Sequence, residues 1–417
     1  MNNSLLFRLD WLSLLTYIAL VSFGIINIYS TTFSDSALSI WNPASISGKQ
    51  FWIFGACLIA MPFILYIKSN FFEHFSYIFY GLSILSLIGL FIFGQTISGA
   101  TSWYSICGFS LQPAEFTKIT TALVVAEFLS GIQRDIRKRN DLIIALLFIL
   151  IPVVLIILQP DAGSALVFFG LFFVFIREGL DMHWLFFSLG LIVVFIATLI
   201  FKPLIVSIGI ALVTLIVFGS LKKSNVKLNP FLYTLGVCIV FSYSVDFIFN
   251  SVFEQRHRDR FNIILGLESD TRGIGYNINQ SKIAIGSGGF SGKGYLNGTQ
   301  TKGDFVPEQH TDYIFSTVGE EWGFLGSSFI ILLFTLLIFR IIYRAEKQSS
   351  AFRRMFSYAF ASILFVHFFV NIGMTLGLVP TVGIPLPFIS YGGSSLMAFS
   401  LMLFIYLNFD CNRLSLS

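Results

Sequence analysis

The stretch LIIALLFILIPVVLIIL, residues 142–158, contains no charged and no hydrogen-bonding side chain. An apolar run of about 17–25 residues is long enough to cross the hydrocarbon core of a bilayer as an α-helix. A helix on the surface of a soluble protein would instead show a polar face. Because backbone groups in lipid must be hydrogen-bonded within the protein, this run predicts a membrane-spanning helix.

The composition of the whole chain agrees with that prediction. Of its 417 residues, 55% are hydrophobic and 12% are charged, whereas soluble chains carry about 25% charged residues. The mean hydropathy is +0.81. These values exclude a cytosolic enzyme, a disordered protein and a disulfide scaffold. The net charge is only +4, and basic residues form short clusters between apolar runs, so we expect a membrane protein with no nucleic-acid partner.

Further apolar segments resemble this run, and together they predict an all-α, polytopic transmembrane helical bundle of about twelve spans. We interpret residues 1–417 as a single integral membrane domain. The first span is expected to stay uncleaved, because no small-residue cleavage site follows it. The expected spans are approximately Trp11–Ile28, Phe51–Ile67, Phe75–Phe93, Pro113–Ser130, Leu142–Leu158, Ala162–Ile176, Trp184–Phe201, Leu204–Gly219, Phe231–Asn250, Tyr313–Phe339, Met355–Leu378 and Phe388–Phe409.

The Lys and Arg residues of the short loops indicate the orientation, because the inside face of a membrane protein carries the excess. With the N-terminus inside, the short outer loops hold only Lys49 and Lys202. An even number of spans, with both termini cytoplasmic, preserves this pattern. Residues 251–312 then form a long outer loop, in which Asn279–Leu296 predicts a short amphipathic helix followed by a glycine-rich turn.

Two motifs place charged residues where a span begins. In QPAEFTK, Glu115 and Lys118 lie three positions apart and can pair on one helix face. They are either a self-neutralising pair that lets the helix insert or a charged wall of a polar cavity. In QPDAGSAL, Asp161 is either a helix cap or part of an outer site. Trp103, in the preceding outer loop, is either an interfacial aromatic or a site residue.

The motif FVPEQHTDYIF, residues 305–315, ends the long outer loop and enters a span. Asp312 lies at the membrane boundary, either as a helix N-cap or as a carboxylate placed to accept a proton. Glu320 follows eight positions later, so both acids are expected on roughly one helix face. Because acids inside a span are hard to explain by packing, Asp312 is the candidate catalytic base.

The long outer loop also supplies cations and glycines. Arginine side chains and the N–H groups of glycine-rich turns bind phosphate, although GSGGFSGKG lacks the spacing of a P-loop. With an acid above an apolar bundle, they suggest a lipid-linked diphosphate substrate. The segment Gly377–Ser395 is either a re-entrant turn lining the same cavity or a plain tight hairpin. The candidate substrate-binding residues are Trp103, Glu115, Lys118, Asp161, Arg256, Arg258, Arg260, Gln280, Ser281, Lys282, Lys293, Gln300, Glu308, His310, Thr311, Glu320, Ser390 and Tyr391.

Six motifs, in this order along nearly the whole chain, resemble those of the SEDS family, the shape, elongation, division and sporulation proteins: GATSWYS, QPAEFTK, QPDAGSAL, QSKIAIGSGGFSGKGYLNGTQ, PEQHTDYIF and NIGMTLGLVPTVGIPLPFISYGGSS. The pairing of GKG with GTQ is more similar to the RodA branch than to the FtsW branch. Family members usually have ten spans, so the resemblance implies a transmembrane hairpin inserted at residues 203–250. Ser102 stands where relatives often carry a basic residue.

The resemblance implies a peptidoglycan glycosyltransferase of the bacterial inner membrane, active at the periplasmic face in cell elongation and rod shape. Such enzymes polymerise lipid II, a disaccharide-pentapeptide on undecaprenyl diphosphate, beside a class B penicillin-binding protein that cross-links the strands. Asp312 matches the family's catalytic acid, and Trp103, Glu115 and Lys118 match other functionally important positions. A divalent cation, Mg or Mn, is also implied, although no metal-ligand spacing is evident in the sequence.

Three alternatives stay open at this point. A lipid II flippase would need a polar passage through the bilayer, and only Glu127, toward the inner half of its span, favours one. A division-specific, FtsW-type paralogue would share the chemistry. A scaffold that recruits the penicillin-binding protein would not need Asp312. The polar motifs gather at the outer ends of the spans, which favours the polymerase.

Overall fold

The structure is a computed structural model that describes residues 8–33, 39–97, 99–106, 109–221, 229–251, 255–265, 267 and 274–413. Helices dominate this part of the chain, which confirms the all-α class that the apolar runs predict. The chain divides into two compact units. The first unit comprises Met1–Gly179 and Asn277–Ser417, and the second comprises Leu180–Tyr276.

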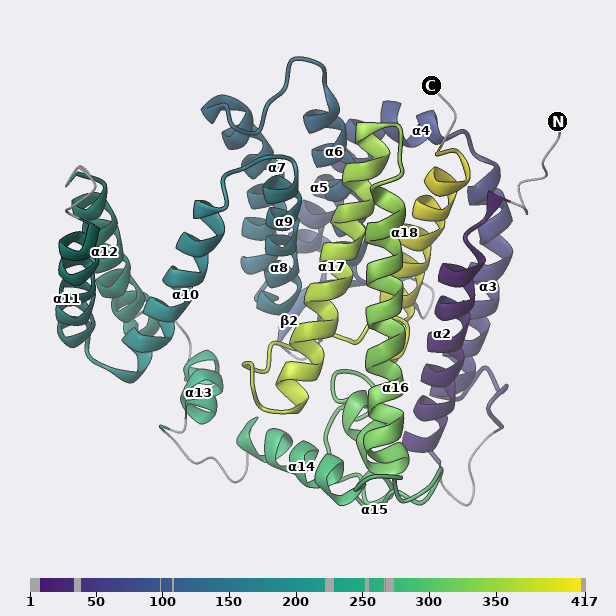
Figure 1. Ribbon diagram of the computed structural model, residues 1–417. Coiled ribbons are helices and arrows are strands. Elements are labelled where there is room, and N and C mark those ends of the chain that lie inside the picture. The colour runs from purple at the N-terminus through teal and green to yellow at the C-terminus, as the bar shows by residue number, and fades with distance from the viewer. Residues whose placement is uncertain are drawn as a thin grey trace. The chain divides into compact units, whose positions relative to one another are not determined.

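The first unit is a bundle of long helices with a layer of short elements at one end (Figure 1). Its helices, with α14 leading back into it from the second unit, are α2 (Trp11–Thr31), α3 (Ile46–Tyr66), α4 (Ser69–His74), α5 (Ser76–Phe93), α6 (Pro113–Ser130), α7 (Arg139–Ile157), α8 (Ala162–Phe168), the 3-10 turn η1 (Phe169–Leu171), α9 (Phe172–Arg177), α14 (Ile274–Ser287), α15 (Thr299–Lys302), α16 (Ile314–Ala345), α17 (Ala351–Thr375) and α18 (Gly393–Cys411). Most residues of α6, α17 and α18 are buried, so these three helices form the centre of the unit.

All twelve expected spans coincide with helices. Ten helices of the described residues are long and apolar enough to cross a membrane. The other two segments are α6, which carries three charged residues, and the shorter stretch Ala162–Arg177. The chain is therefore a multi-pass membrane protein, while the number of spans stays a prediction.

Helix α16 continues past its expected end at Phe339 and ends at Ala345. Arg340 lies 2.9 Å from Asp10, just before α2, and Arg344 lies 3.2 Å from Asp410 in α18. These ion pairs neutralise the charges that suggested a helix boundary. The start of α2 and the end of α18 consequently lie together at one end of the first unit (Figure 1).

A three-stranded antiparallel sheet, which the all-α expectation did not include, lies between α5 and α6. Its strands, in spatial order, are β1 (Gln95–Ile97), β2 (Ala100–Ile106) and β3 (Phe109–Leu111). Trp103 pairs with Gln95, and Tyr104 pairs with Leu111. Thr, Trp and Tyr favour strands, but β1 and β3 have only three residues each, so the sheet is recognised by the pairing between its strands.

The second unit contains α10 (His183–Ile200), α11 (Pro203–Leu221), α12 (Asn229–Ser251) and α13 (Gln255–Ile264). Helices α11 and α12 pack against each other, and the Thr198 hydroxyl of α10 lies 2.9 Å from the Ser242 hydroxyl of α12. The pair α11 and α12 covers the hairpin expected at residues 203–250, whose status as an insertion stays a prediction.

Helix α16 is broken near its start, at Gly323, where φ is 63° and ψ is −156°. Only glycine adopts such a conformation without strain. The glycine-rich turn that follows α14 packs into the break. The N–H of Phe324 donates to the carbonyl of Gly289 at 2.9 Å, and the N–H of Gly294 donates to that of Glu321 at 3.0 Å. The predicted order of a short helix and a glycine-rich turn is thus confirmed.

Candidate active site

Asp312 lies two residues before α16, which begins at Ile314. Helices α14 and α15 lie across the same end of the first unit as the start of α16 (Figure 1). The side chain of Asp312 is half-buried. A Cβ atom placed on Gly383 would lie 3.3 Å from Oδ2 of Asp312. Gly383 belongs to the irregular segment between α17 and α18, so this segment lies against the carboxylate. That segment also explains why α18 begins at Gly393 and not near Phe388.

The residues around Asp312 are joined to the same segment by hydrogen bonds. The Ser390 hydroxyl donates to the carbonyl of Thr311 at 2.6 Å, and the N–H of Tyr391 donates to that of His310 at 2.8 Å. The Thr311 hydroxyl donates to Oε2 of Glu308 at 2.9 Å. Burial raises the pKa of Tyr391, so its phenol stays protonated near neutral pH. Five of the predicted site residues therefore surround Asp312.

Two expectations about Asp312 are wrong in their geometry. Tyr313, and not Asp312, occupies the N-cap position of α16. Asp312 therefore lies outside the helix, and the helical spacing expected between it and Glu320 does not apply. The Asp312 carboxylate lies against Gly383, whereas the Glu320 carboxylate accepts hydrogen bonds from Thr301.

Glu320 is completely buried and anchors the outer loop to α16. Its Oε1 accepts from the Lys293 ammonium at 2.8 Å and from the N–H of Gln300 at 2.8 Å. Its Oε2 accepts from the N–H of Thr301 at 2.9 Å and from the Thr301 hydroxyl at 2.7 Å. Glu320, Lys293 and Gln300 were predicted to bind the substrate. In the structure they form an internal hydrogen-bond cluster, because Glu320 accepts from both of the others.

The expected pairing of Glu115 with Lys118 is confirmed, at 2.7 Å. Both side chains are 2% exposed, in the centre of the bundle. Lys118 also lies 2.9 Å from Nε2 of His367 on α17. His367 and Asn371 on the same helix had no place in the sequence prediction. Two polar residues four positions apart in an apolar helix are the signal that could have found them.

Asp161 caps α8, as one reading of the sequence predicts. One carboxylate oxygen accepts from the N–H of Ser164 at 3.0 Å, and the other accepts from the Gln112 side chain at 2.8 Å. Gly163, two residues on, packs directly against the carbonyl of Val382. The start of α8 therefore lies beside the segment that carries Gly383.

The helix α14 is attached to the end of α17. The Ser281 hydroxyl donates to the carbonyl of Thr375 at 2.8 Å, and the Lys282 side chain runs across Gly377. Gln280 is half-buried in the same helix, and Trp103 is half-buried in β2. The exposed Lys282 therefore lies against Gly377, which begins the segment that leads to Gly383.

The three predicted arginines belong to α13 in the second unit. Arg258 donates to the carbonyl of Asn250 at 3.2 Å. The side chains of Arg256 and Arg260 lie outside the described residues. A phosphate-binding role for all three stays a prediction.

Among the described residues, no three His, Cys, Asp or Glu side chains gather closely enough to hold a metal ion. The divalent cation implied by the family resemblance has no such ligand set in this part of the chain. A metal at this site therefore stays a prediction.

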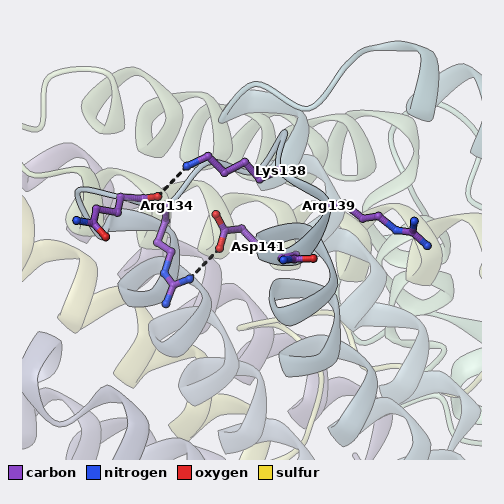
Figure 2. A pocket seen from close by; sticks show the side chains of 6 residues that line it. Arg134, Lys138, Arg139 and Asp141 are labelled. Carbon is purple, nitrogen blue, oxygen red and sulfur yellow. Dashed lines mark hydrogen bonds and ion pairs between the residues drawn. The ribbon is translucent and has the colours of Figure 1, made fainter.

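A separate pocket lies in the loop between α6 and α7, at the opposite end of α6 from Pro113 (Figure 2). Within it, Arg134 donates to Asp141 at 2.8 Å and Lys138 donates to the carbonyl of Gln133 at 3.2 Å. The segments around Asp312 meet the other end of α6, where the N–H of Gln112 donates to the Ser394 hydroxyl. The pocket is therefore not part of the candidate site.

The FtsW/RodA/SpoVE family model, described as cell cycle protein, matches residues 10–223 and 185–413. The peptidoglycan glycosyltransferase MrdB of Escherichia coli K12 is 32% identical over 388 residues, covering 92% of this chain and 91% of the relative. The peptidoglycan glycosyltransferase RodA of Treponema pallidum is 32% identical over 415 residues, covering 93% and 94%.

A chain in a solved structure of a peptidoglycan synthase complex, concerned with polymerisation and crosslinking, superimposes with a TM-score of 0.71 at 26% identity. The match covers 98% of this chain and 99% of that one. Sequence and fold agree over nearly the full length. This chain therefore belongs to the FtsW/RodA/SpoVE family.

Proposed function

We propose that this protein is a peptidoglycan glycosyltransferase that polymerises lipid II for cell elongation and rod shape. Family membership and the names of its relatives support the reaction class. The observation that carries the assignment is the half-buried carboxylate of Asp312, placed against Gly383 at the end of an apolar bundle. Lipid substrates reach such a position from the bilayer while their sugars stay in water.

In this mechanism, the sugar hydroxyl of the acceptor attacks the anomeric carbon of the donor, and the bond to the lipid diphosphate breaks with inversion. Asp312 takes the proton from the attacking hydroxyl, a role that contributes about 10²–10⁴-fold in rate. The diphosphate leaves with its electron pair and needs positive charge nearby. Lys282 is exposed and can supply it, whereas Lys118 is buried and paired with Glu115.

The membrane location and the partner follow from the same assignment. The polar segments around Asp312 lie at the end of the bundle opposite to the Asp10–Arg340 ion pair, which the distribution of basic residues assigns to the cytoplasm. The site would then face the periplasm from the inner membrane. A class B penicillin-binding protein is the proposed partner, in keeping with the structural similarity to a synthase complex.

Polymerisation in detergent tests the assignment against the flippase alternative. Purified protein incubated with labelled lipid II and no bilayer is expected to make glycan chains that a muramidase digests. A transporter has no membrane to cross under these conditions and leaves lipid II unchanged. Intact lipid II after incubation with folded protein and a class B partner would therefore reject the polymerase.

Substitution of Gly383 by alanine tests the contact with Asp312. Its φ of +71° is a left-handed conformation that costs roughly 1–2 kcal/mol for an L-residue. The new Cβ would also press on the carboxylate oxygen, 3.3 Å away. We expect turnover to fall at least fivefold, measured as initial rate at saturating lipid II. Gly190→Ala, where a Cβ meets no atom within 4 Å, is the control and should leave turnover unchanged.

A further inference from the structure

Two polar side chains of α17 face the segment that lies against Asp312. His367 and Asn371 are both 0% exposed, although α17 is otherwise mostly apolar. Residues four positions apart lie on the same face of a helix. Buried polar groups are stabilised only when they are hydrogen-bonded, so their partners indicate what the two side chains do.

The side-chain amide of Asn371 joins Asp312 to that segment. Its Nδ2 donates to the carbonyl of Asp312 at 2.9 Å and to the carbonyl of Ile384 at 2.7 Å. Two carbonyl oxygens require the NH₂ group on this side, which fixes the orientation of the amide. Ile384 follows Gly383, the residue against which the carboxylate lies. The Asn371 amide therefore binds both Asp312 and the residue that follows Gly383, and so holds together the contact between Asp312 and Gly383.

His367 binds Pro385, the residue that follows Ile384 in the segment. The Lys118 ammonium donates to Nε2 of His367 at 2.9 Å, so Nε2 is an acceptor and the ring proton is on Nδ1. Nδ1 in turn donates to the carbonyl of Pro385 at 3.1 Å. Through the ion pair of Lys118 with Glu115, the segment is connected to the buried first turns of α6.

We propose that Asn371 and His367 are positioning residues, which set the segment 383–385 and the Asp312 carboxylate at the spacing that proton transfer requires. This proposal rests on the polymerase function proposed above. Both side chains are 0% exposed, so their effect on the reaction is exerted through this segment. A base displaced by about 1 Å loses on the order of 100-fold in rate, because proton transfer needs a hydrogen-bonded geometry.

Steady-state kinetics on matched variants test the proposal. In Asn371→Ala, we expect kcat for lipid II polymerisation to fall at least tenfold while KM changes less than twofold. Asn408→Ala is the control, because Asn408 in α18 is equally buried and donates to the carbonyls of Ile64 and Ile67, remote from Asp312. Its kcat should stay within twofold of wild type. Equal losses of kcat in both variants, or a wild-type kcat in Asn371→Ala, would overturn the role.

Variants of His367 provide a second test that does not depend on the folding of the first. Glutamine can accept from Lys118 and donate to Pro385, so His367→Gln should keep most of kcat. Leucine can do neither, and His367→Leu should lose at least tenfold. Similar kcat values in the two variants would contradict a positioning role for His367.

Hydrogen–deuterium exchange separates this proposal from the polymerase function. The backbone N–H groups of residues 383–391, other than Pro385 and Pro387, should exchange at least tenfold faster in Asn371→Ala than in wild type. Asn408→Ala should leave their exchange unchanged. Unchanged exchange in Asn371→Ala would overturn the positioning role, whatever the activity. If the wild-type protein does not polymerise lipid II, but exchange is still faster in Asn371→Ala, only the polymerase assignment is overturned.

Discussion

Replacement of Asp312 by asparagine is expected to lower the rate of lipid II polymerisation by at least 100-fold. The amide has nearly the shape of the carboxylate but cannot take a proton, and general-base catalysis is worth about 10²–10⁴-fold. The main-chain carbonyl of Asp312, which accepts from Asn371, is unaffected. The protein should therefore fold normally and still bind lipid II, as measured by the thermal unfolding midpoint and by retention of labelled substrate.

Asp304→Asn is the matched control for this experiment. Asp304 is an exposed acid in the same outer loop, and it accepts from the Gln309 side chain at 3.1 Å. An asparagine can keep this hydrogen bond and tolerates the φ of 52° found there. Near-wild-type rates in both variants would show that Asp312 is not the base. Loss of rate in both would point to the loop and not to one carboxylate.

Substitution of Lys118 by methionine is expected to have the largest effect on stability. Methionine fills a similar volume but leaves the Glu115 carboxylate, 2% exposed, without its ion-pair partner. Removing one member of a buried ion pair costs about 3–5 kcal/mol. The variant should unfold at a clearly lower temperature in detergent. Arg177→Met removes the exposed pair with Glu346, which is worth about 1 kcal/mol at most, and serves as the control.

The double variant Glu115→Gln/Lys118→Met tests the cause of that loss. With both charges removed, no unpaired carboxylate is buried, so most of the lost stability should return. His367 would still lack the donor to its Nε2, so activity should stay low. A double variant as unstable as Lys118→Met would show that packing around Lys118, and not charge, is responsible.

The sequence predicted the helices and the pairing of Glu115 with Lys118, because both depend on local spacing. It also predicted the group of residues that surrounds Asp312, because five of them lie in two short motifs. The small sheet was missed, because it exists only through pairing between its strands. The spacing of His367 and Asn371 in an apolar helix could have indicated a buried polar pair, but not its partners, which are main-chain carbonyls of an irregular segment and of Asp312.

The glycine-rich turn illustrates the same limit. Its N–H groups suggested an anion-binding turn, but those of Lys293 and Gly294 donate to the carbonyls of Glu320 and Glu321. These carbonyls lie just before the break at Gly323, and a sequence does not show where a helix will be broken. The abundance of glycine in the turn is explained by close backbone packing, since a Cβ on Gly292 would collide with the carbonyl of Glu321.

The break at Gly323 divides α16 into two parts that are attached to different regions of the protein. The outer part, Ile314–Trp322, is attached to the glycine-rich turn and follows directly after Asp312. The inner part is held at its far end by the ion pairs of Arg340 and Arg344. A pull on the glycine-rich turn would therefore move the outer part, together with the Asp312 that precedes it, about Gly323, while the ion pairs hold the inner part in place.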